Sequence, residues 1–196
     1  PSQFLDIKGD QRYVTSGAQA DMGFTIPAAI GVSAAKNRGE VIGITGDGSF
    51  QTNIQELQTI KHYQMPIKIF VWNNHGYLSI RTTQKKFFDG RFIGVDQDSG
   101  VSLPDIKKIT EAYGLKYFKI ETTKDLESGI QDVLNWDGPV VCEVMCQKTQ
   151  EVVPTLISTK TKDGRIVSRP FEDMYPLLTR EEFHDNMIID PINYEE

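Results

Sequence analysis

The sequence predicts an α/β protein, a three-layer sandwich in which a mainly parallel sheet lies between two layers of helices. Three observations predict this class. Runs dense in β-branched and apolar residues alternate with segments of helical spacing between about residues 10 and 150. The runs are densely apolar rather than alternating, as in strands that are buried on both faces. The segments between them are long enough for the right-handed crossovers that join parallel strands.

Two strands and two helices are predicted in the first half of the chain. A helix rich in small residues covers residues 26–36, and a dense apolar run at Val41–Thr45 predicts the first strand. The next helix contains residues 53–63, in which every third or fourth side chain is apolar. A second strand is predicted at Ile67–Trp72.

The second half repeats the alternation. A helix that begins near Ile106 is ended by Gly114, and the strand Tyr117–Glu121 follows. Apolar residues at helical spacing predict another helix over residues 126–134, before a last strand at Val140–Met145. In such folds ligands bind at the carboxyl ends of the strands, so functional residues are expected there.

Beyond Gln147 the strand-like runs stop and several prolines break the periodicity. We expect one domain for residues 1–196, with a core at about 10–150 and a tail at 151–196 that wraps around the domain or a partner. Residues 160–165 are predicted as an exposed turn. Because the chain opens with Pro1 rather than Met, we expect a fragment of a larger protein.

Composition excludes several classes of protein. Hydrophobic residues make up 39% and charged residues 24%, which is typical of soluble domains, and no apolar run approaches the roughly 20 residues that span a bilayer. The net charge of −6 disfavours binding to nucleic acid. An anionic ligand would therefore need backbone amides or a metal ion to hold it.

The two cysteines predict the compartment. Cys142 and Cys146 are four residues apart in a predicted strand, which places their Cα atoms roughly 13 Å apart. A disulfide needs about 4.4–6.8 Å. Both are therefore interpreted as free thiols of a reducing compartment, and with no signal peptide we expect the cytoplasm.

The first predicted strand ends in Gly46-Asp47-Gly48-Ser49, immediately before a helix. Glycines on both sides of Asp47 let the backbone turn and approach a ligand closely. Amides of Gly48 and Ser49 could bind a phosphate, but the carboxylate would repel it unless a cation lay between them. A hard divalent cation such as Mg²⁺ bridges the two.

The next strand ends in Asn73-Asn74-His75-Gly76. If the two strands are neighbours, the amide oxygen of Asn74 and the carbonyl of Gly76 could complete the metal site. Each motif alone is ordinary turn or loop sequence. Their joint occurrence at consecutive strand ends is specific, whereas the glycine spacing does not fit a dinucleotide fingerprint and no P-loop is present.

These two motifs together match the thiamine-diphosphate motif, and Met22–Gly31 and Asn53–Leu57 resemble the acetolactate-synthase branch of that enzyme family. The resemblance covers roughly residues 10–150 and implies the thiamine-diphosphate-binding fold, in the C-terminal domain that binds the diphosphate. It implies that Asp47, Asn74 and the Gly76 carbonyl bind Mg²⁺.

The resemblance also implies contacts with the cofactor. Gly48 and Ser49 would contact the diphosphate, with Gly46 and Tyr77 in the same cofactor site. Met22 would hold the cofactor bent, so that its amino group approaches the reactive carbon, and the carbonyl of Ala20 would accept a hydrogen bond from that group. Simple packing is the alternative for Met22.

The family activates its cofactor with a glutamate on a pyrimidine-binding domain, usually of the other subunit, which this chain lacks. The resemblance therefore implies a fragment that is inactive alone, a homodimer or homotetramer, and a middle domain that can carry FAD. The implied reaction decarboxylates a 2-oxo acid and joins the product to a second carbonyl compound. A simple decarboxylase, a non-catalytic binding subunit and an unrelated flavodoxin-like domain are the alternatives.

One segment departs from the branch. Where acetolactate synthases carry Gly-Met-Val and Gln-Trp-Gln runs, this chain has residues 78–84, with Thr83 at the indole position. A wider substrate pocket is expected, in which Arg81 could meet an anionic or polar substrate. His75 is interpreted as a spectator, with an acid–base role as the alternative. His62 and His184 are expected on the surface.

Overall fold

A computed structural model of the chain describes residues 5–161 and 163–192. The chain divides into two compact units, with the boundary between Thr149 and Gln150. No described helix combines the length and the apolar character needed to cross a bilayer.

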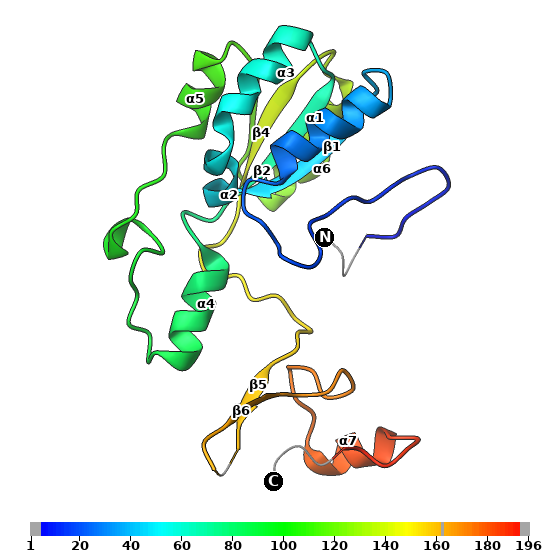
Figure 1. Cartoon of the computed structure of the whole chain (residues 1–196), viewed down its shortest axis with the longest axis vertical. Coiled ribbons are helices and arrows are strands. Elements are labelled where there is room, and N and C mark those ends of the chain that lie inside the picture. The colour runs from blue at the N-terminus through cyan, green and yellow to red at the C-terminus, as the bar shows by residue number, and fades with distance from the viewer. Residues whose placement is uncertain (1–4, 162, 193–196) are drawn as a thin grey trace. The chain divides into compact units, whose positions relative to one another are not determined.

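A four-stranded parallel sheet forms the centre of the first unit (Figure 1). Its strands lie in the order β1 (Val41–Gly46), β2 (Ile67–Asn73), β4 (Val140–Met145) and β3 (Lys116–Ile120). All four predicted strands are confirmed, with ends that differ by at most one residue. In the register of β1 and β2 Gly46 pairs with Trp72, so both strands end at the same edge. The predicted neighbours are therefore real neighbours.

Three helices pack on one face of this sheet: α1 (Thr25–Ala35), α3 (Leu57–Tyr63) and α5 (Ile106–Ala112). They enclose the larger core, whose fully buried side chains include Leu57, Ile60 and Val71. Burial of such side chains, at about 1.5–3 kcal/mol each, holds the helices on the sheet.

A single helix, α6 (Leu126–Asn135), packs on the other face, where Val133 meets Phe70 and Cys142 of a smaller core. Helices on both sides of a parallel sheet confirm the predicted three-layer α/β class. Cys142 and Cys146 are both free thiols, as predicted, and burial raises the pKa of Cys142 to about 12.

The helix predicted across residues 53–63 is wrong as a single element. The structure has α2 (Asp47–Thr52), a 3-10 turn at Ile54–Glu56 and then α3. Asn53 breaks the helix with φ −133° and ψ 37°, because its side-chain amide donates to the carbonyl of Gly23 across the fold (3.0 Å). A helical pattern in sequence does not reveal that long-range bond.

Residues 78–87 form a helix that was not predicted. α4 (Leu78–Phe87) follows the second motif and occupies the segment that departs from the acetolactate-synthase branch. Short 3-10 turns at Gln97–Ser99 and Thr123–Asp125 complete the first unit.

The second unit corrects the expectation that strand-like structure ends at Gln147. β5 (Ser158–Lys160) and β6 (Ile166–Ser168) form an antiparallel pair, and the helix α7 (Arg180–Asn186) follows. The predicted turn at residues 160–165 joins the two strands, although Thr161 within it is buried and residue 162 lies outside the described residues. Two arginines, Arg169 and Arg180, bind the buried carboxylate of Asp173.

Candidate functional site

Asp47 lies at the tip of β1, as the first residue of α2. Its side chain is buried, with 5% of the residue exposed. One carboxylate oxygen accepts a hydrogen bond from its neighbour, the backbone N–H of Gly48 (2.9 Å). The other accepts from the backbone N–H of Gly76 (2.9 Å), in the loop after β2. The two sequence motifs therefore meet, at the shared edge of adjacent strands.

The charge of Asp47 is poorly compensated. Burial raises the pKa of this carboxyl, and the N–H groups of Gly76 and Gly48 together with the positive charge of His75 only partly offset that rise. Among the described residues no lysine or arginine forms an ion pair with Asp47. A buried carboxylate is costly unless a cation pairs with it, so the position favours binding of a cation.

Asn74, directly after β2, adds an oxygen in need of a partner. Its side-chain Oδ1 is buried and accepts no hydrogen bond. A buried, unpaired acceptor is rare and calls for an explanation such as an ion. No group of three or more His, Cys, Asp or Glu side chains within the described ranges could hold a metal. A cation here would instead depend on one carboxylate with amide and carbonyl oxygens, which suits Mg²⁺.

Close packing fixes the backbone around the site. A Cβ on Gly48 would lie 2.2 Å from the ring of Tyr77, and one on Gly76 would lie 2.0 Å from the carbonyl oxygen of Val95. The ring of Tyr77 therefore lies directly against Gly48. The N–H of Tyr77 donates to the same Val95 carbonyl (2.9 Å). Any side chain at either glycine would displace the loops that carry the site.

Two side chains from the α2 region hold the segment that contains Met22. The hydroxyl of Ser49 accepts from the N–H of Gly23 (2.9 Å), and the Asn53 amide donates to the carbonyl of Gly23. Met22 is 51% exposed, and Ala20 has a left-handed φ of 53°. In the sequence, Asn53 lies at the start of a predicted helix and in the stretch that resembles acetolactate synthases, but neither feature predicts a contact for its side chain.

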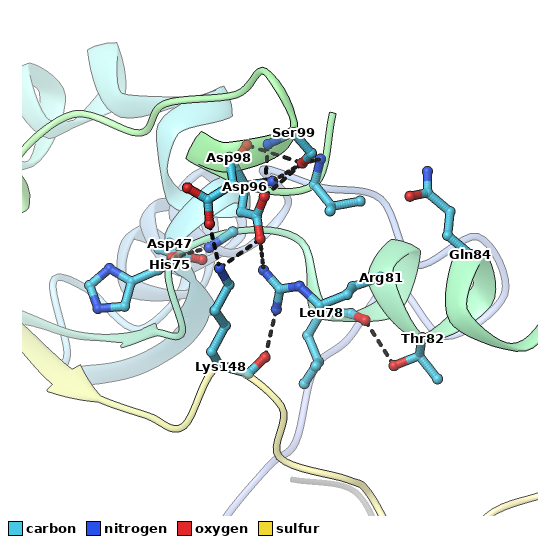
Figure 2. A network of polar contacts seen from close by, with 12 residues as sticks. Asp47, His75, Leu78, Arg81, Thr82, Gln84, Asp96, Asp98, Ser99 and Lys148 are labelled. Carbon is cyan, nitrogen blue, oxygen red and sulfur yellow. Dashed lines mark hydrogen bonds and ion pairs between the residues drawn. The ribbon is translucent and has the colours of Figure 1, made fainter. Parts of the chain in front are cut away.

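Arg81 is buried and paired within the protein, so the expectation that it meets an anionic or polar substrate is wrong. The residue is 6% exposed, and its guanidinium points from α4 to Asp96 (3.3 Å) and to the backbone carbonyl of Lys148 (2.5 Å), as Figure 2 shows. A buried arginine needs such partners. The network ties α4 to the chain that leaves β4.

Lys148 completes this network. Its ammonium lies 2.8 Å from Asp96 and 3.4 Å from Asp98. The hydrogen bond from Lys148, with a further one from Ser99, holds the pKa of Asp96 well below its usual range. Asp96 follows Val95, whose carbonyl lies against Gly76. The network therefore anchors the loop that packs on the second motif.

Comparison with known proteins identifies the family. Residues 1–144 match the thiamine pyrophosphate enzyme family, in its C-terminal TPP-binding domain. The chain belongs to this family. Acetolactate synthase large subunits from Pyropia yezoensis and Haemophilus influenzae are 34% and 35% identical over 86% and 83% of the chain, respectively. The chloroplastic acetolactate synthase of Arabidopsis thaliana is 31% identical over 84%.

The chain spans 26–28% of the length of these relatives. Among solved structures, the thiamine diphosphate-dependent 4-hydroxybenzoylformate decarboxylase of Rhodococcus jostii RHA1 is similar, with a TM-score of 0.58 and 30% identity. The match covers 67% of this chain and 24% of that one. These matches confirm the TPP-binding fold and the resemblance to acetolactate synthases.

The thiamine pyrophosphate enzyme domain thus brings most of its predicted site residues to one sheet edge. Hydrogen bonds join Asp47 to Gly48 and Gly76. The Tyr77 ring packs against Gly48, and Ser49 binds the segment that contains Met22. Gly46 is the residue before α2. His75 is exposed beside them. His62 and His184 are exposed, as expected.

Proposed function

We propose that this domain binds Mg²⁺ through the carboxylate of Asp47, the amide oxygen of Asn74 and the carbonyl of Gly76, and through the metal holds the diphosphate of thiamine diphosphate. One observation carries the proposal. Asp47 is a buried carboxylate without a paired cation, and Asn74, at the neighbouring strand end, has a buried oxygen without a partner. A single divalent cation satisfies both.

The residues around the metal site suit a diphosphate. The N–H of Gly48, which Asp47 now engages, becomes available to a phosphate oxygen once the carboxylate binds the cation. Gly46 leaves open space at the start of α2, and the ring of Tyr77 forms a wall beside Gly48. The metal ion would neutralise the diphosphate, and these groups would orient it.

Met22 and Ala20 would shape the organic part of the cofactor. The half-exposed thioether of Met22 offers an apolar support, and the Ala20 carbonyl offers an acceptor to the cofactor amino group. Bound thiamine diphosphate supplies the carbanion chemistry that cleaves a 2-oxo acid next to its carbonyl. This chain's own contribution is to fix the geometry of the group that reacts.

For the whole protein we propose decarboxylation of a 2-oxo acid followed by ligation to a second carbonyl compound. The acetolactate synthase relatives support this reaction. The site would be completed by a pyrimidine-binding domain, in a homodimer or homotetramer, because none of the residues assigned to the cofactor supplies an acid to its pyrimidine.

A simple decarboxylase is the second candidate. One observation favours it: the similar solved structure is a decarboxylase. Product analysis with a 2-oxo acid substrate separates the two. Release of free aldehyde alone excludes ligation, and a coupled product excludes the simple decarboxylase. Cofactor binding without any turnover would favour a non-catalytic subunit.

Calorimetry on the full-length protein tests the cofactor site directly. Thiamine diphosphate should bind in the presence of Mg²⁺ and lose its affinity when a chelator removes the metal. In Asp47→Asn, thiamine diphosphate should bind weakly whether or not Mg²⁺ is present, because the amide carries no charge to attract the cation. Asp132→Asn is the matched control, since Asp132 is an exposed residue of α6, on the opposite face of the sheet. Binding that is indifferent to Mg²⁺ and to Asp47→Asn would refute the proposal.

A further inference from the structure

A buried acid, Glu143, lies in the middle of the sheet near the site and has no role so far. It belongs to β4 and is 8% exposed. Its two carboxylate oxygens accept from two other strands: the side-chain amide of Asn73 at the end of β2 donates to one (2.5 Å), and the hydroxyl of Tyr117 in β3 donates to the other. The acid therefore joins three neighbouring strands.

The hydrogen bonds continue from Glu143 to the metal-site loop. The Oδ1 of Asn73 accepts from the backbone N–H of His75 (2.9 Å), a residue with a left-handed φ of 60°. The next N–H, that of Gly76, donates to Asp47. A continuous chain of contacts thus runs from β3 through β4 and β2 to the tip of β1. Asp47, Asn73, Tyr117 and Glu143 also line one cleft of about 750 Å³.

Glu143 decides which way the Asn73 amide faces. An ionised carboxylate accepts hydrogen bonds and cannot donate, so it must face the NH₂ group of Asn73. The amide oxygen is then the only group left to accept from His75. If the amide turned over, its NH₂ would oppose the N–H of His75, and the left-handed residue would lose the bond that holds it.

We propose that Glu143 is a positioning residue, which acts through Asn73 to hold residues 74–76 in the conformation that presents the Gly76 backbone to Asp47. Its carboxylate binds Asn73 and Tyr117, neither of which is a proposed metal ligand. The consequence for Mg²⁺ affinity rests on the proposed function, whereas the effect on the loop itself does not.

Hydrogen exchange in the metal-free, full-length protein tests the effect on the loop. Peptides that cover residues 73–77 should exchange about tenfold or more faster in Glu143→Leu, because the loop opens locally once the amide is free to turn. Asn73→Ala should show the same increase. The double variant should exchange no faster than Asn73→Ala alone, because Glu143 acts through Asn73.

Conservative and control variants distinguish positioning from a general loss of stability. Glu143→Gln should stay near the wild-type rate, because its amide oxygen still accepts from Asn73 while the Tyr117 hydroxyl turns to accept from its NH₂. Glu121→Gln removes an exposed acid just after β3 and should change nothing. If Glu143→Leu does not fold, Asn73→Ala decides the question. Wild-type exchange of residues 73–77 in the variants that fold would overturn the proposal.

A Mg²⁺ titration in the presence of thiamine diphosphate tests the consequence for the metal. Residues that orient metal ligands typically change metal affinity by about 10–100-fold, so Glu143→Leu should weaken Mg²⁺ binding by that factor and Glu143→Gln should restore most of it. Unchanged affinity in Glu143→Leu would overturn the link to the metal. If wild-type protein shows no Mg²⁺-dependent binding, the proposed function fails, and hydrogen exchange still judges the positioning role.

Discussion

Three buried aspartates of this chain differ in how their charge is compensated. Asp96 pairs with Arg81 and Lys148, and Asp173 pairs with two arginines of its own unit. Asp47 is also buried, yet within residues 5–161 and 163–192 the hydrogen bonds to its carboxylate come from backbone N–H groups alone. The contrast matters because the other two buried aspartates pair with arginine or lysine side chains. Of these three aspartates, Asp47 is therefore the one whose environment leaves room for a separate cation.

Gly76 is predicted to be irreplaceable for steric reasons, independently of any ligand. Its φ is +140°, and a Cβ there would lie 2.0 Å from the Val95 carbonyl oxygen, a backbone atom that cannot swing away. Gly76→Ala should lower the free energy of unfolding by about 2–4 kcal/mol in metal-free protein. Denaturant unfolding, followed by circular dichroism, measures this.

Gly46→Ala is the matched control at the same sheet edge. No atom lies within 4 Å of a Cβ built on Gly46, and its φ of −85° suits any residue. Its stability should change by less than about 1 kcal/mol, as expected for a helix N-cap position. Equal losses in the two variants would show that the conformation of Gly76 is not the cause.

Residues of the site differ in how far the sequence revealed them. Asp47 and Asn74 could be predicted, because each follows an apolar strand and the ends of adjacent parallel strands meet. The partners of Arg81 and Asn53 could not. Arg81 binds Asp96 and the Lys148 carbonyl, and Asn53 binds Gly23, through contacts that no local spacing encodes. The positive charge of Arg81 suggested a substrate as its partner, but in the folded protein its guanidinium pairs with Asp96.

Among the helices and strands, the predictions that were confirmed concern elements with many buried apolar residues. The central strands β2 and β4 bury consecutive side chains, most of them apolar, between two layers of helices, so their sequences differ plainly from a loop. α4 lacks such a signal, because the only buried residue of this helix is Arg81. Polar contacts hold α4 in place instead, among them the bonds of Gln84 to the backbone of Ile93. A helix of this kind escapes prediction from apolar periodicity.

Two glycines, in helices on opposite faces of the sheet, should respond in opposite ways to replacement by alanine. Gly31 lies in the interior of α1, is exposed, and has open space around it, with no atom within 4 Å of where a Cβ would lie. Gly31→Ala should raise the free energy of unfolding by about 0.5–1 kcal/mol, since alanine loses less backbone freedom on folding. Thermal or denaturant unfolding of the variant measures the gain.

Gly129 of α6 provides the opposing case. A Cβ there would lie 2.7 Å from Cγ1 of Ile120, so this glycine lets α6 approach β3 closely. Gly129→Ala should destabilise the protein by about 1–3 kcal/mol despite its better helix propensity. A gain in stability at Gly129 would mean that α6 packs less closely on β3 than the structure shows.

For the whole molecule, the sheet explains why residues far apart in sequence form one site. β1 and β2 are adjacent and parallel, so the crossover through α2 and α3 returns the chain to the same edge. β4 then lies between β2 and β3, which places Glu143 beside Asn73. The parallel class could be predicted from sequence, whereas the order β1-β2-β4-β3 could not, because strand order depends on contacts between whole elements.

The first unit should fold without the second, because both of its hydrophobic cores lie within residues 5–149. A chain that ends at Thr149 should therefore unfold cooperatively. A chain that ends at Gln147 should unfold at a midpoint about 5 °C or more lower, because Arg81 loses the Lys148 carbonyl while it stays buried. Circular dichroism of the two truncated chains measures both midpoints.

Lys148→Met in the chain that ends at Thr149 separates the two contributions of this residue. The variant keeps the backbone carbonyl for Arg81 and removes the ammonium from Asp96. Its midpoint should lie between those of the two truncated chains, because one of the two contacts survives. Equal midpoints for all three chains would show that the network does not stabilise the unit. Loss of cooperative unfolding in the chain that ends at Thr149 would show instead that the α/β unit depends on residues 150–196.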